Sequence, residues 1–267
     1  MPTIARKDAT LYYETHGSGH PLVFIHGGGG NTLAFCQQVM HFRDRYRVIT
    51  MDLRGFHRSV LAPGVVSHPA DFPDDLLAVL DAEGISSAAL VCQSLGAWAG
   101  LPLAVRHPER VSCLFINGSP TPAYSEENWR TLRRATGIFN EAGAERDAAV
   151  GWNRKTARER PELMFLYAQI KQLNPGFDST PMMDERVRLH PRDFAGYAVP
   201  TLVAGGSHDD FLNGESHLHV ATLIPGATAH TFPDTGHSTY FEDAPAFNRT
   251  LDAFLARHAP SRAAPQA

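Results

Sequence analysis

Short apolar runs, each four to eight residues long and followed by a polar or glycine-bearing loop, dominate the sequence pattern. The clearest are PLVFIH (21–26), RVITMD (47–52), AALVC (88–92), VSCLFING (111–118), PTLVAGG (200–206) and AHTF (229–232). Runs of this length that are rich in Val and Ile predict buried strands. Because helical segments alternate with them, we predict an α/β fold in which helices flank both faces of a mostly parallel sheet.

The segment DFPDDLLAVLDAEG (71–84) illustrates the predicted covering helices. Its apolar residues fall on one helical face, and acidic residues occupy its first turn. Gly84 is expected to end the helix by adopting a left-handed backbone conformation. A last amphipathic helix is expected over 245–258.

The alternation stops between residues 121 and 195, which are rich in arginine and contain helical segments at 127–140 and 161–173. A chain of 267 residues can form one α/β domain with an insertion. We therefore predict a core of residues 1–120 and 196–258 with a helical cap over 121–195. The small, proline-containing segment 259–267 is expected to be a flexible tail.

Charge and hydropathy limit the partners of the chain. Its formal net charge of −4 lacks the basic excess of nucleic-acid-binding proteins. It has no apolar signal segment at its start and no stretch near the roughly 18 apolar residues of a membrane span. We expect a cytoplasmic protein that acts on a small molecule, without a nucleic-acid or membrane partner; a homo-oligomer is compatible with these features.

The cysteines Cys36, Cys92 and Cys113 are too few and too scattered for a disulfide framework or a zinc site. We expect them to be reduced and buried. A reactive thiol at Cys92 is the alternative, but this cysteine ends a predicted strand and has no base of its own. We expect no metal and no cofactor.

The segment VCQSLGAWAG (91–100) places Ser94 between small residues directly after a predicted strand. A serine nucleophile needs a base, an acid that orients the base, and donors for the oxyanion. Asp209 and His237 also follow predicted strands, at the sheet edge where open α/β sheets place their sites. A serine among small residues also occurs by chance, and His237 is one of 14 histidines.

These residues resemble the α/β-hydrolase superfamily, and the likeness covers almost the whole chain apart from the helical insertion. The order Ser, Asp, His is that of the family. The segment LVFIHGGGG (22–30) is similar to the oxyanion loop of the family, and VITMDLRGFHRS (48–59) is similar to its Asp-x-x-Gly-x-Gly-x-Ser segment. The segment HPERV (107–111) is similar to the end of the helix after the nucleophile. LVAGGSHDD (202–210) is similar to the acid loop, and DTGHSTYFEDAPAFNRTLDAFL (234–255) to the histidine loop with the final helix.

The resemblance implies a role for each residue. Ser94 is the expected nucleophile and His237 the base. Asp209, three residues after Gly206, is the expected acid, which leaves Asp210 as a solvated neighbour. The backbone N–H groups of Gly28 and Leu95 are the expected oxyanion donors.

The likeness is to the esterase, lactonase and C–C hydrolase branch with a small helical cap. It implies a serine hydrolase that cleaves a carboxylic ester or lactone through an acyl-enzyme. C–C bond hydrolysis of a diketone-like compound is the first alternative. A hydrolase-like binding protein or a cofactor-free enzyme of another reaction type is the second, because a fold does not determine a reaction. Haloalkane dehalogenation is disfavoured because position 94 is not aspartate.

Three residues depart from the commonest family pattern or from regular structure. Cys92 stands where glycine is commonest, and its small side chain is expected to be tolerated. His57 replaces a residue that is often glycine and is either a substrate contact or an ordinary loop residue. Pro102 falls inside the helix after Ser94 and is expected to bend it. His26, in the predicted oxyanion loop, is expected to be structural.

Aromatic and methionine side chains in the cap are candidates for an apolar substrate pocket. We take Trp129, Trp152 and Phe165 as the main candidates, together with Phe139, Tyr167, Met182 and Met183. Such residues more often serve simple packing, so only two or three of them are expected to reach the ligand. The substrate is therefore expected to carry an apolar group.

Overall fold

The computed structural model describes residues 2–145 and 151–259. Its centre is a sheet in the order β1-β2-β4-β3-β6-β7-β8-β9, with β5 paired to β2. The strands are β1 (Thr3–Ala5), β2 (Ala9–His16), β3 (His20–Ile25), β4 (Tyr46–Met51), β5 (Val60–Leu61), β6 (Ala88–Gln93), β7 (Val111–Asn117), β8 (Thr201–Gly206) and β9 (Thr228–Phe232). The six strands that the apolar runs predict are all present.

Strands β3, β4 and β6 to β9 pair in parallel, as in the register Phe24↔Val91 between β3 and β6. The strands at the amino-terminal edge pair antiparallel, as in Tyr13↔Met51 between β2 and β4. This antiparallel edge was not expected from the sequence. The parallel strands end at one edge of the sheet, so the loops that follow them lie together.

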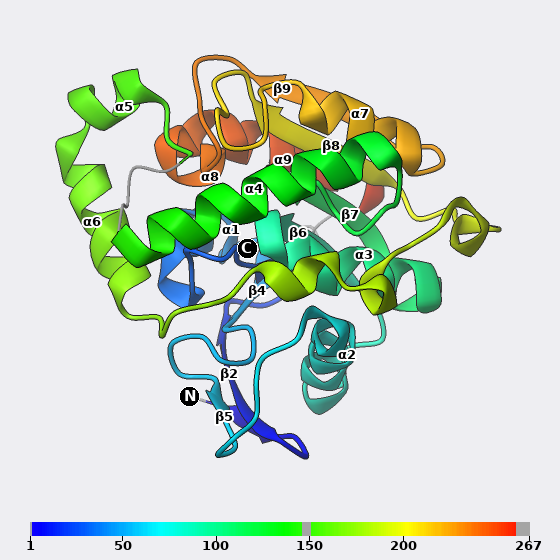
Figure 1. Cartoon of the computed structure of the whole chain (residues 1–267). Helices are drawn as coiled ribbons and strands as arrows, with labels where there is room; N and C mark the ends of the chain where they lie inside the picture. The colour runs from blue at the N-terminus through cyan, green and yellow to red at the C-terminus, as the bar shows by residue number, and fades with distance from the viewer. Residues whose placement is uncertain (1, 146–150, 260–267) are drawn as a thin grey trace.

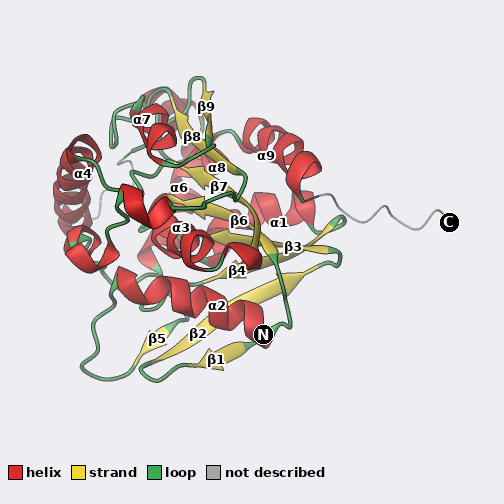
Figure 2. Ribbon diagram, turned by 90° about the vertical axis from the view of Figure 1, so that its right-hand side faces the viewer, coloured by secondary structure: helices red, strands yellow, loops and turns green. Residues whose placement is uncertain are grey.

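Helices cover both faces of the sheet (Figure 2). They are α1 (Cys36–Phe42), α2 (Phe72–Ala82), α3 (Ala97–Arg106), α4 (Glu126–Glu145), α5 (Arg154–Glu159), α6 (Pro161–Gln172), α7 (Ser216–Leu223), α8 (Thr239–Glu242) and α9 (Ala244–His258). Buried side chains of α2, α3 and α7 form one apolar cluster with the sheet, and those of α1 and α9 form the other. The predicted α/β-hydrolase architecture is confirmed.

Local signals account for the ends of α2. Acidic residues lie in its first turn, and Gly84 beyond its end has φ +63°, the left-handed conformation that glycine adopts without a steric cost. Helix α3 continues through the buried Pro102 to Arg106.

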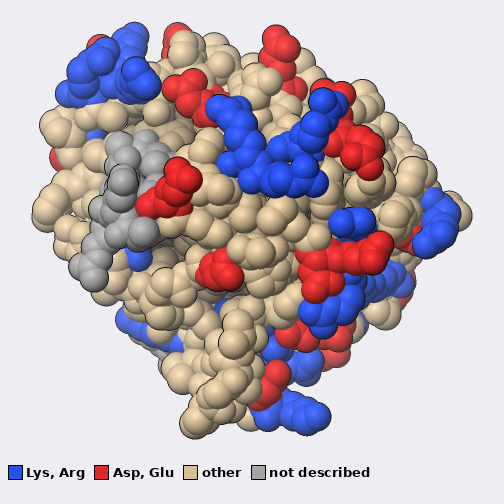
Figure 3. Space-filling model, viewed as in Figure 1, with Lys and Arg blue, Asp and Glu red and all other residues tan. Residues whose placement is uncertain are grey.

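The segment between β7 and β8 is helical and contains α4, α5, α6 and three 3₁₀ turns, η5 (Thr180–Met183), η6 (Glu185–Val187) and η7 (Pro191–Phe194). A bridge between Ala123 and Leu189 joins its two ends. Helix α4 lies in front of the sheet in Figure 1. Basic and acidic side chains lie close together toward the top and right of this face, and uncharged side chains cover much of the rest (Figure 3).

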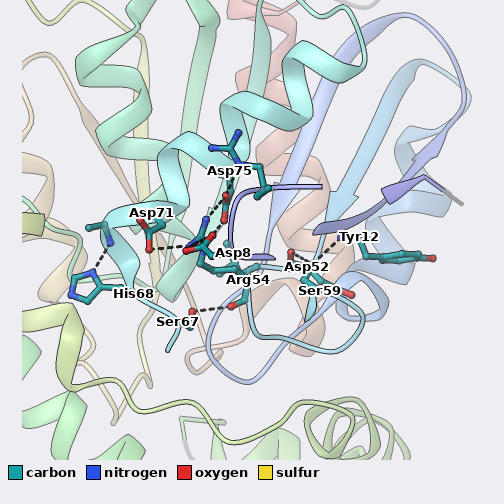
Figure 4. Close-up of polar contacts among 12 residues, drawn as sticks. Asp8, Tyr12, Asp52, Arg54, Ser59, Ser67, His68, Asp71 and Asp75 are labelled. Atoms are coloured by element: carbon teal, nitrogen blue, oxygen red, sulfur yellow. Dashed lines mark hydrogen bonds and ion pairs between the residues drawn. The ribbon is translucent and has the colours of Figure 1, made fainter. Parts of the chain in front are cut away.

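The loop after β4 is held by a buried arginine (Figure 4). The Arg54 guanidinium donates two hydrogen bonds to Asp75 of α2, at 2.6 and 2.7 Å, and pairs with Asp8 and Asp71. Bidentate pairs of this kind hold a loop in one orientation. Arg54 therefore fastens the loop that carries Asp52 and His57.

Ala259 is buried, and the rest of the predicted tail, residues 260–267, lies outside the described residues. Within the described ranges, no helix has the length and apolar character that a membrane crossing requires.

Candidate active site

Ser94 stands at a sharp turn between β6 and α3, where a 3₁₀ turn (Ser94–Gly96) opens the helix. Its φ is +48°, a left-handed value that is uncommon for a residue with a side chain. Such strained conformations persist only where the surroundings enforce them, and they concentrate at functional sites. Gly96 contributes to that enforcement, because a Cβ there would collide with the carbonyl oxygen of Ile25.

Cys92, two residues before Ser94, is completely buried at the end of β6. Its sulfur lies against Gly100 of α3, and a Cβ at position 100 would collide with it. Glycine at position 100 thus provides the space that the cysteine needs between strand and helix. Burial raises the pKa of the Cys92 thiol far above its usual range, which disfavours the reactive thiolate.

The other two cysteines differ from each other. Cys113 is buried, and burial raises its pKa to about 12. Cys36 is exposed, so the expectation that all three thiols are buried is wrong for this residue. It starts α1 at the molecular surface, and the buried side chains of that helix are Gln38, Val39 and Phe42.

Asp209 and His237 lie in the loops after β8 and β9 and form a hydrogen-bonded pair. The Nδ1–H of His237 donates to Oδ2 of Asp209 at 2.8 Å, since an ionised carboxylate only accepts. The other carboxylate oxygen accepts the backbone N–H groups of Phe211 and Leu212 at 3.1 and 3.0 Å. Both side chains are buried, so the contact is shielded from water.

Asp210, the competing carboxylate, is exposed. Its backbone carbonyl oxygen accepts a hydrogen bond from Arg134 of α4. The geometry therefore pairs the imidazole with Asp209.

His237 is enclosed on two sides by backbone. A Cβ on Gly151 would lie 2.8 Å from Cβ of His237, and one on Gly118 would lie 2.8 Å from its carbonyl oxygen. On a third side, the ring of Phe211 packs edge-on against the imidazole at 4.8 Å between centroids. These contacts leave the ring little room to turn.

The loop Gly27–Gly30 follows β3 and is held in place by hydrogen bonds of His26 and Asp52. His26 accepts the N–H of Leu53 at Nε2, so its Nδ1 donates to the carbonyl oxygen of Gly27 at 2.7 Å. Burial lowers the pKa of His26, which agrees with a neutral ring. Asp52 accepts the N–H of Thr32 at 2.7 Å. His26 therefore has a structural role in holding this loop.

A narrow pocket opens beside Ser94. Gly28 and Leu95, the expected oxyanion donors, line it together with Ser94. The remaining lining comes from the cap and from the loops after β7 and β8, and it consists of Pro120, Leu132, Ala135, Thr136, Phe139, Phe177, Ser179, Met182, Phe211 and Leu212. None of these described lining residues carries a charge.

The cap residues that the sequence singled out divide into two groups. Phe139 and Met182 line the pocket, within the expected number of two or three. Trp129 and Trp152 are buried elsewhere: Trp129 packs on Tyr124, and Trp152 packs on Tyr167 and Phe241. Phe165 is 67% exposed on α6. Trp129 of α4, Phe165 of α6 and Trp152 in the loop before α5 are therefore not part of the wall of this pocket, which does not support their choice as substrate contacts. Tyr167 and Met183 do not line it either.

His57 also does not line the pocket. Its φ is +42°, in the left-handed region that glycine adopts without a steric cost. Its Nδ1 lies 3.3 Å from Oδ2 of Asp52. His57 is a loop residue beside Asp52 in this structure.

The sequence did not single out most of the pocket wall. Leu132, Ala135 and Phe139 of α4 follow a helical spacing of three and four residues, which is the same signal that ordinary packing gives. Phe177 lies in a loop with no recognisable pattern.

Comparisons with known proteins identify the family of the chain. The family model described as alpha/beta hydrolase fold matches residues 20–244. A 2-hydroxymuconate semialdehyde hydrolase of Pseudomonas putida is 30% identical over 96% of this chain and 95% of its own length. A solved N-acyl homoserine lactone degrading enzyme, Est816, is 26% identical with a TM-score of 0.76, covering 95% of this chain and 100% of that one.

The solved enol-lactonase of Burkholderia xenovorans LB400 also has a TM-score of 0.76 at 22% identity, covering 96% of this chain and 100% of that one; at this identity the likeness concerns the fold alone. The match of the family model spans both the Ser94 turn and the His237 loop. This chain is a member of the α/β-hydrolase family and a hydrolase.

Proposed function

We propose that the chain is a serine hydrolase that cleaves a neutral carboxylic ester or lactone through an acyl-enzyme. The observation that carries the proposal is the left-handed Ser94, which lines an uncharged pocket together with Gly28 and Leu95. The buried His237–Asp209 pair supplies a base and the acid that orients it.

In this mechanism the Ser94 hydroxyl oxygen attacks the substrate carbonyl carbon while Nε2 of His237 takes the hydroxyl proton. The backbone N–H groups of Gly28 and Leu95 stabilise the oxyanion, and Asp209 stabilises the imidazolium. The imidazolium then protonates the departing alkoxide, leaving an acyl-Ser94 ester. Water, deprotonated by His237, hydrolyses that ester and releases the acid.

C–C bond hydrolysis is the second candidate, because several relatives are named as hydrolases of 2-hydroxymuconate semialdehyde or of 2-hydroxy-6-oxo-dienoates. A dienoate carries a carboxylate, and a buried carboxylate is costly without a charged or hydrogen-bonding partner. The described pocket residues include no cationic side chain. This difference favours the neutral ester or lactone, for which the lactone-degrading neighbour offers a precedent.

A substrate panel tests the proposal: p-nitrophenyl esters, unsubstituted γ- and δ-lactones, and a 2-hydroxy-6-oxo-dienoate. We expect turnover of esters or lactones and covalent labelling by a fluorophosphonate. Ser94→Ala should fold, lose roughly a million-fold in kcat, and resist labelling. A wild-type preference for the dienoate would replace ester hydrolysis with C–C hydrolysis, and labelling of Ser94→Ala would move the nucleophile elsewhere.

A further inference from the structure

Glu242 is a buried carboxylate that the proposed mechanism does not use. It ends the short helix α8, five residues after His237, and is 5% exposed. A carboxylate in such a place needs hydrogen-bond donors to offset the loss of water. The hydrogen-bond donors of its carboxylate show which segments of the chain it connects.

The Glu242 carboxylate accepts three hydrogen bonds, and each comes from a backbone N–H group. Oε2 accepts from Gly236 at 3.0 Å and from Asn153 at 3.1 Å, and Oε1 accepts from Ser238 at 3.2 Å. Gly236 and Ser238 are the two neighbours of His237 in the chain. Asn153 belongs to the cap, immediately before α5.

The same two segments are joined by further contacts. The N–H of His237 donates to the carbonyl oxygen of Gly151 at 2.5 Å, and the Asn153 side chain donates to the carbonyl oxygen of Asp234 at 2.9 Å. A Cβ on Gly236 would collide with the carbonyl oxygen of Gly151. Cap residues 151–153 and the histidine loop 234–238 therefore lie in backbone contact, and Glu242 binds both.

The charge of Glu242 also bears on His237. Burial raises the pKa of Glu242, while its three N–H donors and its attraction to His237 oppose that rise. Both carboxyl oxygens accept hydrogen bonds, as an ionised carboxylate does. An anion held here favours a positive charge on the nearby imidazole, which is the state that forms when His237 takes the serine proton.

The other titratable groups near Glu242 and His237 do not change this effect of the Glu242 charge. Burial raises the pKa values of the Tyr167 and Tyr240 phenols, so both are neutral at neutral pH. Asp209 lies on the other side of the imidazole, at Nδ1. Arg154 and Lys155, next to Asn153, are exposed.

We propose that Glu242 is a positioning residue: it fastens cap residues 151–153 to the loop that carries His237, and its negative charge stabilises the imidazolium during turnover. The inference rests on the proposed hydrolase function for its catalytic part. The hydrogen-bonded link between cap and loop stands on the contacts alone.

The test compares Glu242→Gln with Asp243→Asn. Each substitution removes one negative charge, but Asp243 caps α9 by accepting the N–H of Ala246, a role that asparagine also fills. For Glu242→Gln we expect kcat on a short ester to fall about ten- to hundred-fold, the scale of a small misplacement of a catalytic group, with KM changed less than about three-fold. The low-pH limb of kcat/KM should move to lower pH, because an imidazole without the nearby anion is harder to protonate. Asp243→Asn should keep the wild-type rate and limb.

Amide hydrogen exchange supplies a readout that does not depend on turnover. The N–H groups of Asn153, Gly236 and Ser238 should exchange faster in Glu242→Gln than in the wild type. Glu242→Asp keeps the charge but shortens the reach by one methylene, so it should lose protection and kcat while its low-pH limb stays near that of the wild type. If the glutamine variant does not fold, the aspartate variant alone decides the link.

Wild-type rates and exchange in the variants would overturn the proposal. An equal loss of kcat/KM at every pH in Glu242→Gln would overturn the role of the charge. If the wild type turns over neither esters nor lactones, the proposed function fails, while the exchange rates still decide whether Glu242 joins cap and loop.

Discussion

The Ser94 turn and the cap wall of the pocket face the same space, but different forces hold them. The turn is constrained through its backbone, by the left-handed φ of Ser94 and by close approaches at Gly96 and Gly100. The cap wall is held by side-chain packing, as between Phe139 and Phe177, whose ring centroids are 6.5 Å apart.

This difference decides how each region responds to change. A backbone held in one strained conformation requires particular residue types at particular positions, so a substitution there is costly. A wall of apolar side chains accepts other residues of similar volume. Substitutions in the turn and its loops should therefore abolish activity or stability, whereas substitutions in the cap should change selectivity.

Beyond Ser94 itself, the largest effect is expected at Asp209, which accepts the hydrogen bond from the imidazole of His237. Asp209→Asn should lower kcat by roughly four orders of magnitude, because the amide no longer holds the imidazole in the required tautomer. The loss is measured as the change in kcat for ester hydrolysis at pH 7. Asp210→Asn is the matched control and should stay close to wild type, since that carboxylate is exposed; the opposite ranking would assign the acid to Asp210.

A smaller effect, on stability, is expected where β6 meets α3. Gly100→Ala should lower the free energy of unfolding by about 1–3 kcal/mol, because the added methyl collides with the Cys92 sulfur. Cys92→Ala in the same chain should restore most of that loss by removing the sulfur. Urea denaturation of the single and double variants measures both changes, and additive losses would show that the two residues do not compete for space.

The smallest effect is expected in the cap wall. The Phe139 ring lies over Gly28, and Phe139→Ala should open the pocket to longer acyl chains. Each further methylene buried is worth about 0.8 kcal/mol, or roughly four-fold in kcat/KM. A series of p-nitrophenyl esters from acetate to octanoate measures the preferred length.

Phe165→Ala is the control for that series, because its ring is exposed on α6 and is absent from the pocket. It should leave the preferred length unchanged. If the two alanine variants gave the same profile, the cap wall would not select chain length, and the contrast between turn and cap would need another explanation.

The two regions also differ in how well the sequence predicts them. Six strands, the ends of α2 and the Ser94 turn follow from short local patterns, because each depends on a few neighbouring residues. The antiparallel edge of β1, β2 and β5 lacks such a pattern. Strand β2 pairs with β4 and β5 through residues far apart in the chain, such as Tyr13 and Met51.

Trp129, Trp152 and Phe165 are absent from the pocket wall for a related reason. An aromatic residue in the cap segment has the same local signature whether it faces a pocket, another part of the chain or water. Trp152 packs on Tyr167 and Phe241, while Phe139 reaches Gly28. Which outcome applies depends on how the cap helices lie on the core, and that is decided by contacts between distant segments.

By itself, the sequence determined the α/β architecture and the places of Ser94, Asp209 and His237 after predicted strands, because short apolar runs and the turns that follow them are local patterns. The family and the expected roles of the three residues came from the resemblance of their motifs to α/β-hydrolases. Only the tertiary structure decided which cap side chains form the pocket wall, that Cys92 fits because Gly100 makes room, and that Glu242 joins the cap to the histidine loop. These features depend on contacts between segments far apart in the chain, such as Asn153 and Glu242, which are separated by 89 positions. Packing of the folded chain, and no local pattern, brings such residues together.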